Sequence, residues 1–219
     1  MKKIFAFLFI IQFAKAQTTK YDYKIELTNS NKNMSFPFKN FLNNVKTHLL
    51  MNSSGEYFYA TQDGSVPNDE FEMIKIAINS NGSTLKPYQS EFEYIIPWFQ
   101  KNKTQKIAFK TKYKTNWIIT DEVKKINGYI CYKATCVLEQ LYEDDFVEGQ
   151  NLTAWFTPEI KTSSGPNCFS DLPGLIVQLE TSIFNFTLDN IENTTEEIPV
   201  SIEGYKIYSY DEYQEYISK

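Results

Sequence analysis

The sequence of 219 residues contains no arginine, and all 22 of its basic residues are lysines. The planar guanidinium group, which holds a phosphate or a carboxylate through two parallel hydrogen bonds, is therefore missing from the chain. Recognition of a phosphorylated ligand would have to rest on lysine side chains and backbone N–H groups. We do not expect phosphate chemistry to be the main activity.

Histidine is almost absent as well, because His48 is the only one. A Ser-His-Asp triad or a metal site with several histidines cannot be built without it, and we expect His48 to be an ordinary strand or surface residue. The acidic run Glu143, Asp144 and Asp145 lacks the alternating spacing and the closing glutamate of a calcium loop. We therefore predict no enzyme, no catalytic residue, no metal site and no cofactor.

Long apolar runs are missing after residue 16. Residues 1–16 carry lysines at positions 2 and 3, an apolar run from Ile4 to Ile11, and the small-x-small end Ala14-Lys15-Ala16. This pattern predicts a signal peptide that is cleaved near Ala16/Gln17, and hence a periplasmic or secreted protein. No later segment approaches the roughly 20 apolar residues of a membrane-spanning helix, so we expect no transmembrane segment.

The predicted mature chain, residues 17–219, has a length suited to a single domain with a substantial core. Without the three lysines of the first 16 residues it carries 19 basic and 27 acidic residues, a net charge of −8. A negative protein is a poor ligand for nucleic acid or for an anionic membrane surface. We expect neither as a partner.

Cysteine is scarce, with Cys131, Cys136 and Cys168 only. In an exported chain three cysteines suggest one disulfide and one remaining thiol. Cys131 and Cys136 stand five residues apart on one expected strand, so their side chains point to opposite faces. The partner of one of them would then be Cys168.

Apolar and polar residues alternate with a period of two through most of the chain, which predicts a mainly β, antiparallel fold. A long strand is expected over Lys106–Ile119, and a hairpin joins Tyr129–Leu138 to Asn151–Phe156. Further strands are expected over Tyr21–Leu27, Thr47–Met51, Glu56–Thr61, Glu70–Ile78, Glu91–Ile96, Leu175–Leu179 and Tyr205–Tyr208.

Helical signals are few. Ser209 and Glu212 have the spacing of a capping box, and the apolar residues after them predict a short C-terminal helix. The segment from Phe41 to Leu49 fits both a helix and a hairpin strand. The polar, acidic residues 189–197 are expected to form a solvated loop.

The densest motifs are Ala154-Trp155-Phe156-Thr157-Pro158-Glu159-Ile160, Gly165-Pro166 and Asp171-Leu172-Pro173-Gly174-Leu175-Ile176. Pro158 ends a strand, and Pro173-Gly174 predicts a type II turn. Besides this structural role, a rigid turn with apolar neighbours can frame an apolar pocket or a docking edge. The candidate ligand- or partner-binding residues are Trp155, Pro158, Leu172, Pro173, Gly174, Leu175 and Ile176.

These motifs, between Trp117 and Leu179, resemble the GLPGLI family of exported bacterial proteins. The matching residues are Trp117, Thr120-Asp121-Glu122, Ile126-Asn127-Gly128-Tyr129, Cys131, Lys133-Ala134-Thr135, Ala154 to Ile160, Gly165-Pro166, Phe169 and Leu172 to Ile176. The resemblance implies a bacterial periplasmic or envelope location and no established reaction. It also implies a single curved antiparallel sheet, similar to the half-barrel of periplasmic lipid carriers, with few short helices.

The sequence departs from the family pattern at Asp171, at Asn167-Cys168 and at Cys136. Asp171 replaces the first glycine of the name motif, so Asp must tolerate any positive φ there, which it does better than most residues. Cys136 and Cys168 are extra to the pattern. The resemblance thus points to a Cys136–Cys168 disulfide.

Taken together, these features favour an exported, non-enzymatic protein with a binding or assembly role at the bacterial envelope, where another envelope protein would be its partner. The alternative is a periplasmic carrier that holds a hydrophobic or lipid-like ligand in the concave face of the sheet. A carboxylate-based hydrolase comes third. A continuous apolar cavity would favour the carrier, and a filled concavity with an exposed apolar strip would favour protein binding.

Overall fold

The computed structural model describes residues 17–29, 39–53, 55–62, 66–77, 82–84, 91–98, 106–142, 145–198 and 205–209, with the single residues 212 and 215. The predicted signal peptide lies outside this part of the chain. The strands are β1 (Thr18–Leu27), β2 (Val45–Asn52), β3 (Gly55–Gln62), β4 (Gly82–Thr84), β5 (Glu91–Trp98), β6 (Lys106–Lys114), β7 (Ile118–Ile126), β8 (Tyr129–Tyr142), β9 (Asp145–Thr157), β10 (Leu175–Glu180), β11 (Phe184–Thr194) and β12 (Tyr205–Ser209).

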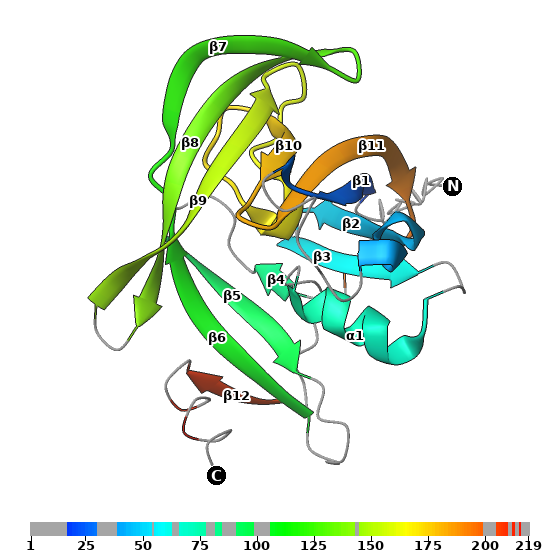
Figure 1. Ribbon diagram of the computed structural model, residues 1–219, viewed down its shortest axis with the longest axis vertical. Coiled ribbons are helices and arrows are strands. Elements are labelled where there is room, and N and C mark those ends of the chain that lie inside the picture. The colour runs from blue at the N-terminus through cyan, green and yellow to red at the C-terminus, as the bar shows by residue number, and fades with distance from the viewer. Residues whose placement is uncertain are drawn as a thin grey trace, which may run out of the picture.

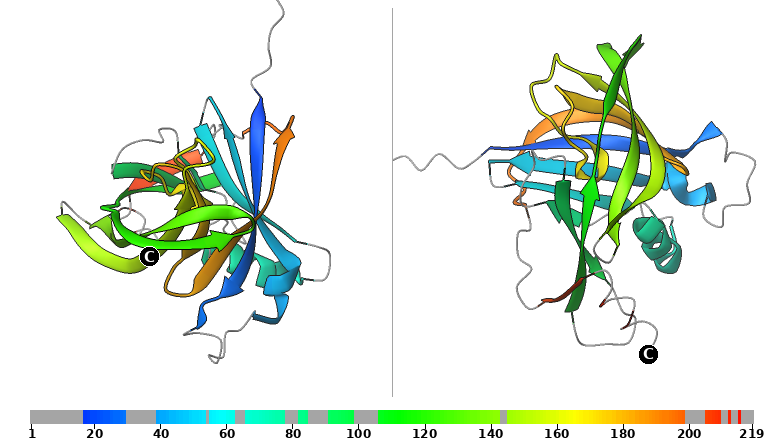
Figure 2. Two further views of the ribbon diagram at one scale, coloured as in Figure 1. Left: turned by 90° about the horizontal axis from the view of Figure 1, so that it is seen from above. Right: turned by 90° about the vertical axis from the view of Figure 1, so that its left-hand side faces the viewer.

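All of these strands belong to one 12-stranded sheet in the order β12-β6-β5-β4-β3-β2-β1-β11-β10-β9-β8-β7 (Figure 1). Neighbouring strands are antiparallel except for β12, which runs parallel to β6. The long strand β8 pairs with β7 along its first half and with β6 at Glu139 and Gln140. The sheet therefore bends strongly instead of lying flat (Figure 2), and the predicted mainly β class with a single curved, open sheet is confirmed.

The helices described are α1 (Asn68–Ala77) and two short 3-10 helices, η2 (Lys39–Asn44) and η3 (Pro166–Cys168). The strand predicted over Glu70–Ile78 is wrong, because this segment forms α1. Pro67 stands just before the helix and its carbonyl accepts the Phe71 N–H at 2.9 Å, and the two acids of the first turn suit the positive end of the helix dipole. Fully buried Ile74 lies three residues after Phe71, a helical spacing.

The solvated loop predicted over residues 189–197 is also wrong for its first part, because β11 continues to Thr194. β1 pairs with this polar end of β11 as far as Thr18↔Thr194. The hydrogen bonds between strand backbones do not require apolar side chains. The exposed end of β11 therefore lacks the alternation of apolar and polar residues from which strands were predicted.

The predicted strand Lys106–Ile119 is divided into β6 and β7 by residues 115–117. β7 then turns into β8 through Asn127 (φ 47°) and Gly128 (φ 95°), two successive positive φ values that are typical of a tight hairpin turn.

The predicted capping box forms, since the Ser209 N–H binds Glu212 Oε2 at 2.8 Å and the Glu212 N–H binds Ser209 Oγ at 3.2 Å. The ambiguous segment from Phe41 is η2 up to Asn44 and strand β2 afterwards.

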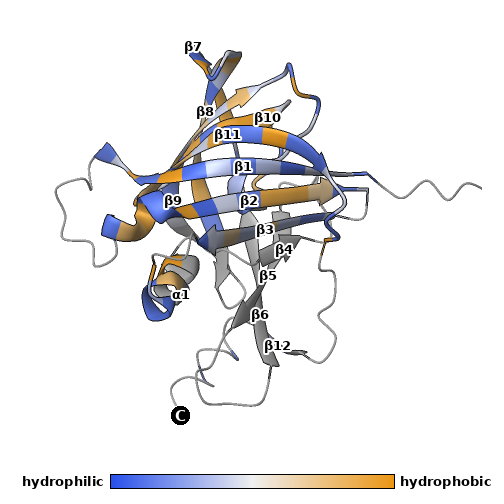
Figure 3. Ribbon diagram, turned by 90° about the vertical axis from the view of Figure 1, so that its right-hand side faces the viewer, coloured by the Kyte–Doolittle hydropathy of each residue, from blue (hydrophilic) through white to orange (hydrophobic). Residues whose placement is uncertain are grey.

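The core lies on the inner face of β1, β2, β3, β10 and β11. Hydrophobic and hydrophilic residues alternate along several of these strands (Figure 3). Aromatic and aliphatic side chains fill this face: Tyr21, Tyr23 and Ile25 from β1, Leu49 from β2, Phe58 from β3, Leu179 from β10, and Phe184, Phe186 and Leu188 from β11.

Candidate functional site

The motif-rich segment 158–174, here called the signature loop, connects β9 to β10 and lies across the inner face of the sheet (yellow in Figure 1). Its helix η3 contacts β2, β3 and β4. On the same side, the Thr162 hydroxyl lies 3.0 Å from Met51 Sδ, and the Tyr23 hydroxyl donates to the Ile176 carbonyl at 2.9 Å. The described part of the concavity is thus filled by the chain's own signature loop.

Two glycines allow the signature loop to pack this closely. A Cβ on Gly165 would lie 2.6 Å from Ile176 Cβ, and a Cβ on Gly174 would overlap the Thr157 carbonyl group. Hydrogen bonds complete the attachment: the Ile176 N–H donates to the Ser164 carbonyl at 2.8 Å, and Trp117 Nε1 donates to the Ser170 carbonyl at 2.9 Å.

The turn at the end of the signature loop differs from the predicted type II turn. The Gly174 N–H donates to the Leu172 carbonyl at 2.8 Å, which closes a three-residue turn around Pro173, and Gly174 has φ 155°, far from the value of a type II turn. Glycine is needed here for its contact with Thr157. Asp171, which replaces the first glycine of the motif that the sequence resembles, has φ 71°, so Asp does tolerate a positive φ at this position.

The seven candidate binding residues do not form one surface. Leu172, Gly174, Leu175 and Ile176 are buried, the three aliphatic ones in the core. Pro158 and Pro173 are exposed, and Trp155 is half-buried beneath Lys124, whose Nζ lies 4.0 Å from the ring centroid. The buried four therefore hold the signature loop in place, and Trp155, Pro158 and Pro173 remain accessible.

Cys131 and Cys136 are free, buried thiols. In the sheet, Cys131 stands opposite Lys124 of β7, and Cys136 stands opposite Leu152 of β9. The two side chains lie on opposite faces of β8, as expected from their spacing. Cys136 is thus a free thiol in this structure and not part of the expected Cys136–Cys168 disulfide. The Cys168 side chain lies outside the described residues, and the pairing stays a prediction.

A row of polar side chains crosses the outer face of β1, β2 and β3. His48 Nδ1 lies 2.6 Å from Asp22 Oδ1, and His48 Nε2 lies 2.6 Å from Thr61 Oγ1. Burial lowers the pKa of His48 in spite of the opposing effect of Asp22. At neutral pH the ring is then neutral, with Nδ1–H donating to Asp22 and Nε2 accepting from Thr61. The only histidine is therefore a buried member of a network, a role that the sequence did not predict.

A second group of polar residues lies beside this row. The Tyr59 hydroxyl donates to Glu196 Oε2 at 2.8 Å, and Lys20 Nζ donates to Glu196 Oε1 at 3.0 Å. The Tyr59 ring lies 4.9 Å from the His48 ring, centroid to centroid. Glu196 thus attaches the segment after β11 to β1 and β3.

A buried carboxyl group faces the signature loop from β3. Glu56 is 1% exposed, and neither of its side-chain oxygens has a hydrogen-bond partner among the described residues. Burial raises its pKa to about 8, while the nearby Ser164 hydroxyl acts weakly in the opposite direction. Glu56 is therefore mostly protonated at neutral pH.

The β7–β8 hairpin carries an exposed apolar surface. The strand register places the side chains of Ile119, Val123, Ile130 and Tyr132 on one face, and they are 51%, 53%, 51% and 37% exposed. We call these four residues the apolar strip. On the same face Tyr132 approaches Phe156 of β9, with 6.0 Å between ring centroids. The apolar strip thus continues the buried face of β9 out into solvent.

β7 is also the last strand of the sheet and pairs with β8 on one side. All nine of its side chains are exposed or half-buried, and those exposed include the charged residues Asp121, Glu122, Lys124 and Lys125. Sequence analysis missed this surface because β7 was not recognised as a strand of its own. The Asn127-Gly128 pair was a signal that could have revealed the hairpin.

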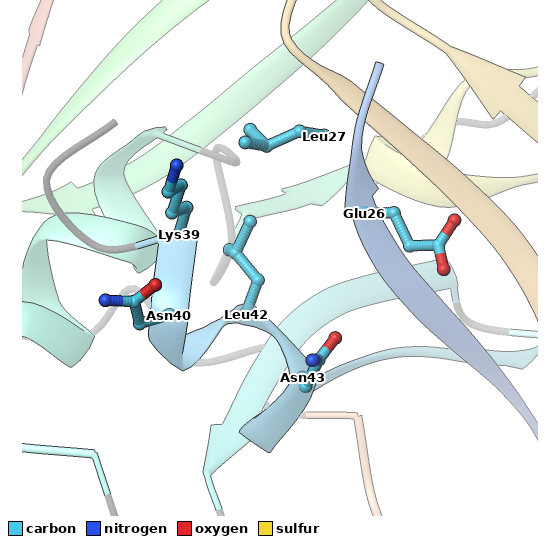
Figure 4. Close-up of a pocket in the computed structure, with 6 residues that line it drawn as sticks. All are labelled: Glu26, Leu27, Lys39, Asn40, Leu42 and Asn43. Atoms are coloured by element: carbon cyan, nitrogen blue, oxygen red, sulfur yellow. The ribbon is translucent and has the colours of Figure 1, made fainter. Parts of the chain in front are cut away.

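A separate hollow of about 550 Å³ opens between the end of β1 and η2 (Figure 4). Its lining is mainly polar: Glu26, Leu27, Lys39, Asn40, Leu42 and Asn43. Only Leu27 and Leu42 offer an apolar wall. None of the predicted site residues lies in this hollow.

Among the residues that the structure describes, no helix combines the length and the apolar character needed to cross a membrane.

Comparison with known proteins yields a family match and a structural likeness. Residues 117–178 match a family described as a protein of unknown function (Porph_ging), and no curated protein matches the sequence. A solved structure of PNGF-II in the P21 space group is similar over 93% of this chain and 34% of that chain, with a TM-score of 0.50 and 16% sequence identity. The chain thus spans about a third of the length of PNGF-II, and this likeness is one of fold. Residues 117–178, from Trp117 through β7, β8, β9 and the signature loop into β10, are similar to a family whose function is not established.

Proposed function

We propose that this chain is an exported, non-enzymatic protein of the bacterial envelope that binds another protein through the apolar strip on its β7–β8 hairpin. The observation that carries the proposal is the exposure of four apolar side chains, Ile119, Val123, Ile130 and Tyr132, on one face of an edge hairpin. Contiguous exposed apolar side chains are costly in water and often mark protein contacts. Export is supported by the pattern of residues 1–16.

The carrier alternative has less support. A lipid carrier needs a continuous apolar cavity, but the signature loop lies on the inner face beside β2, β3 and β4, where Met51 and Glu56 adjoin it. The hollow in Figure 4 has a mainly polar lining.

The enzyme alternative is a carboxylate-based hydrolase. A hydrolase of another kind could use the row Asp22, His48 and Thr61, which has the acid, base and hydroxyl order of a catalytic triad. Acyl transfer requires, besides a triad, positioned donors for the oxyanion and a cleft for the substrate. Thr61 is exposed on the outer face of the sheet, and this position does not by itself provide either. The row has an evident structural role, since it connects β1, β2 and β3. We therefore propose a binding protein and not a hydrolase.

The proposal can be tested by site-specific photo-crosslinking in the organism that makes the chain. A photoreactive phenylalanine analogue would replace Val123 in the apolar strip. The matched control is Ile183, an apolar residue that is 38% exposed in the turn between β10 and β11. After irradiation, protein adducts are identified by mass spectrometry.

We expect a protein adduct from position 123 and none from position 183. Equal adducts from both positions, or none from position 123, would contradict binding through the apolar strip. The strip variant Val123→Lys should abolish a contact that Ile183→Lys leaves intact.

A further inference from the structure

The order of charges along β7 suggests a specific partner for this edge. The strand reads Ile118-Ile119-Thr120-Asp121-Glu122-Val123-Lys124-Lys125-Ile126, with both acids before Val123 and both lysines after it. An antiparallel copy of the same strand, related by a two-fold axis through Val123, would place Asp121 opposite Lys125 and Glu122 opposite Lys124. Val123 would meet its own copy.

From this self-complementarity we infer that the occupant of the β7 edge is a second copy of this chain, joined by antiparallel β7–β7 pairing. The inference rests on the proposed function and names the partner. Opposite charges placed directly across two antiparallel strands attract each other, and like charges repel. A two-fold axis repeats each favourable pair, so one strand supplies both halves of the contact.

The charges on β7 have another accepted role, which is to prevent edge strands from pairing with other chains. Protection of that kind works best with charges of one sign, because two copies then repel each other. β7 instead separates its signs into two halves, an arrangement that attracts its own antiparallel copy.

The structure also indicates which charges a second copy would meet. Glu122 binds Lys133 of the same chain at 2.7 Å, and Lys124 binds Gln178 of β10 at 2.7 Å. Those two side chains are therefore already occupied within the chain. Asp121 and Lys125 are both exposed, which makes them the cross-strand pair to test.

Within the apolar strip, Val123 contributes directly to the same contact by meeting its own copy across the axis. Val123 and Tyr132 form a register pair across β7 and β8, so pairing two β7 strands places two apolar strips side by side about the axis. The register of β7 against β8 is irregular between Ile119 and Val123, and a bulge bends an edge strand. Asp121 and Glu122 lie inside this irregular stretch. The predicted pairing is therefore confined to the few residues around Val123, from Asp121 to Lys125, and we expect a modest, micromolar dimer.

Sedimentation equilibrium of the purified chain tests this proposal through charge reversal. Asp121→Lys places two lysine pairs across the axis, and Lys125→Glu places two acidic pairs there. Each single variant should weaken dimerisation by about tenfold or more. When the two variants are mixed, every cross-strand pair again joins a lysine to an acid. The mixture should recover the affinity of the parent chain as a heterodimer.

The control substitution Lys24→Glu changes an exposed side chain of β1, far from β7 in the strand order. It breaks the ion pair of Lys24 with Asp189 but should leave dimerisation unchanged. Equal thermal unfolding of all the chains would show that the variants fold. A parent chain that stays monomeric at a few hundred micromolar overturns the dimer, and so does a mixture that fails to associate. If the parent is monomeric while position 123 still crosslinks to a different protein, the second copy is wrong as occupant and the proposed function stands. If position 123 captures nothing, the proposed function fails as well.

Discussion

Gly174 packs directly against the Thr157 carbonyl oxygen, so that no side chain fits between β10 and the end of β9. Gly174 also has a positive φ of 155°, a conformation that residues with a Cβ rarely adopt. This contact positions the three-residue turn around Pro173 and places Leu175 at the start of β10. The signature loop therefore depends on a close approach of two backbones.

We predict that Gly174→Ala lowers the free energy of unfolding by about 3 kcal/mol or more, because it adds a backbone clash to a strained φ. Gly128→Ala is the matched control: Gly128 has φ 95°, but a Cβ there meets nothing within 4 Å. That variant should lose only the strain, about 1 kcal/mol. Urea unfolding measures both, and equal losses would show that the contact with Thr157 contributes little.

The buried carboxyl of Glu56 should make the protein less stable as the pH rises. Its pKa is about 8 in the folded chain and 4.5 as an unperturbed group, so the unfolded chain releases this proton first. Between those two pH values stability should fall by about 1.4 kcal/mol per pH unit and then level off.

Glu56→Gln removes this titration. The variant should resemble the parent chain near pH 4.5 and be more stable by about 2 to 3 kcal/mol near pH 7. Glu26→Gln, at an exposed position of β1, serves as the control and should keep the pH dependence of the parent chain. Parallel stability curves for Glu56→Gln and the parent would refute a protonated Glu56.

His48 should act in the opposite direction to Glu56, over a pH range that overlaps with it. Burial lowers its pKa from the ordinary value of 6.5, so the unfolded chain takes up a proton first as the pH falls. The contribution of His48 to stability should therefore be independent of pH above 6.5 and decrease below it, down to the pKa of the folded chain. Because Glu56 titrates in both chains, the contribution is measured as the difference in stability between the parent chain and His48→Gln, by urea unfolding between pH 5 and 7. The chain has no other histidine, so a difference that does not change with pH would exclude this residue.

Cys131 and Cys136 should resist thiol reagents in the folded protein. Both are buried, and burial raises the pKa of each thiol, which disfavours the reactive thiolate. We expect labelling of both at pH 8 only after unfolding in urea, detected by mass spectrometry of the digested protein. A Cys136–Cys168 linked peptide in a non-reduced digest would instead establish the disulfide that the family resemblance suggested.

The strands could be predicted wherever one face is buried and the other is wet. β3 was expected nearly as observed, since buried Phe58 and Ala60 alternate with the more accessible Tyr57, Tyr59 and Thr61. β2 was also expected nearly as observed, as the partner of β3 in a hairpin. The prediction failed for α1, where Phe71 and Ile74 have helical spacing within a segment that also contains many β-prone residues. It failed again at the end of β11, where backbone pairing with β1 holds polar residues in a strand.

The apolar strip and the polar row were missed for different reasons. Tyr132 meets Val123 across a local hairpin, whose Asn127-Gly128 turn was a signal in the sequence. His48 meets Asp22 only because β1 lies beside β2, and pairing between separated segments is a property of topology about which local alternation carries no information. The positive φ of Asp171 is a local property, and the sequence indicated only that Asp would tolerate such a conformation there.

The position of the signature loop has a consequence for how this protein is dissected in the laboratory. The family match ends at residue 178, yet Ile176 binds Tyr23 and Thr162 contacts Met51, both on strands far to the N-terminal side. β10 also loses its neighbour β11 if the chain is cut at 178. A clone bounded by the family match would therefore expose the underside of its own loop and aggregate, and a useful expression boundary includes β1, β2 and β11.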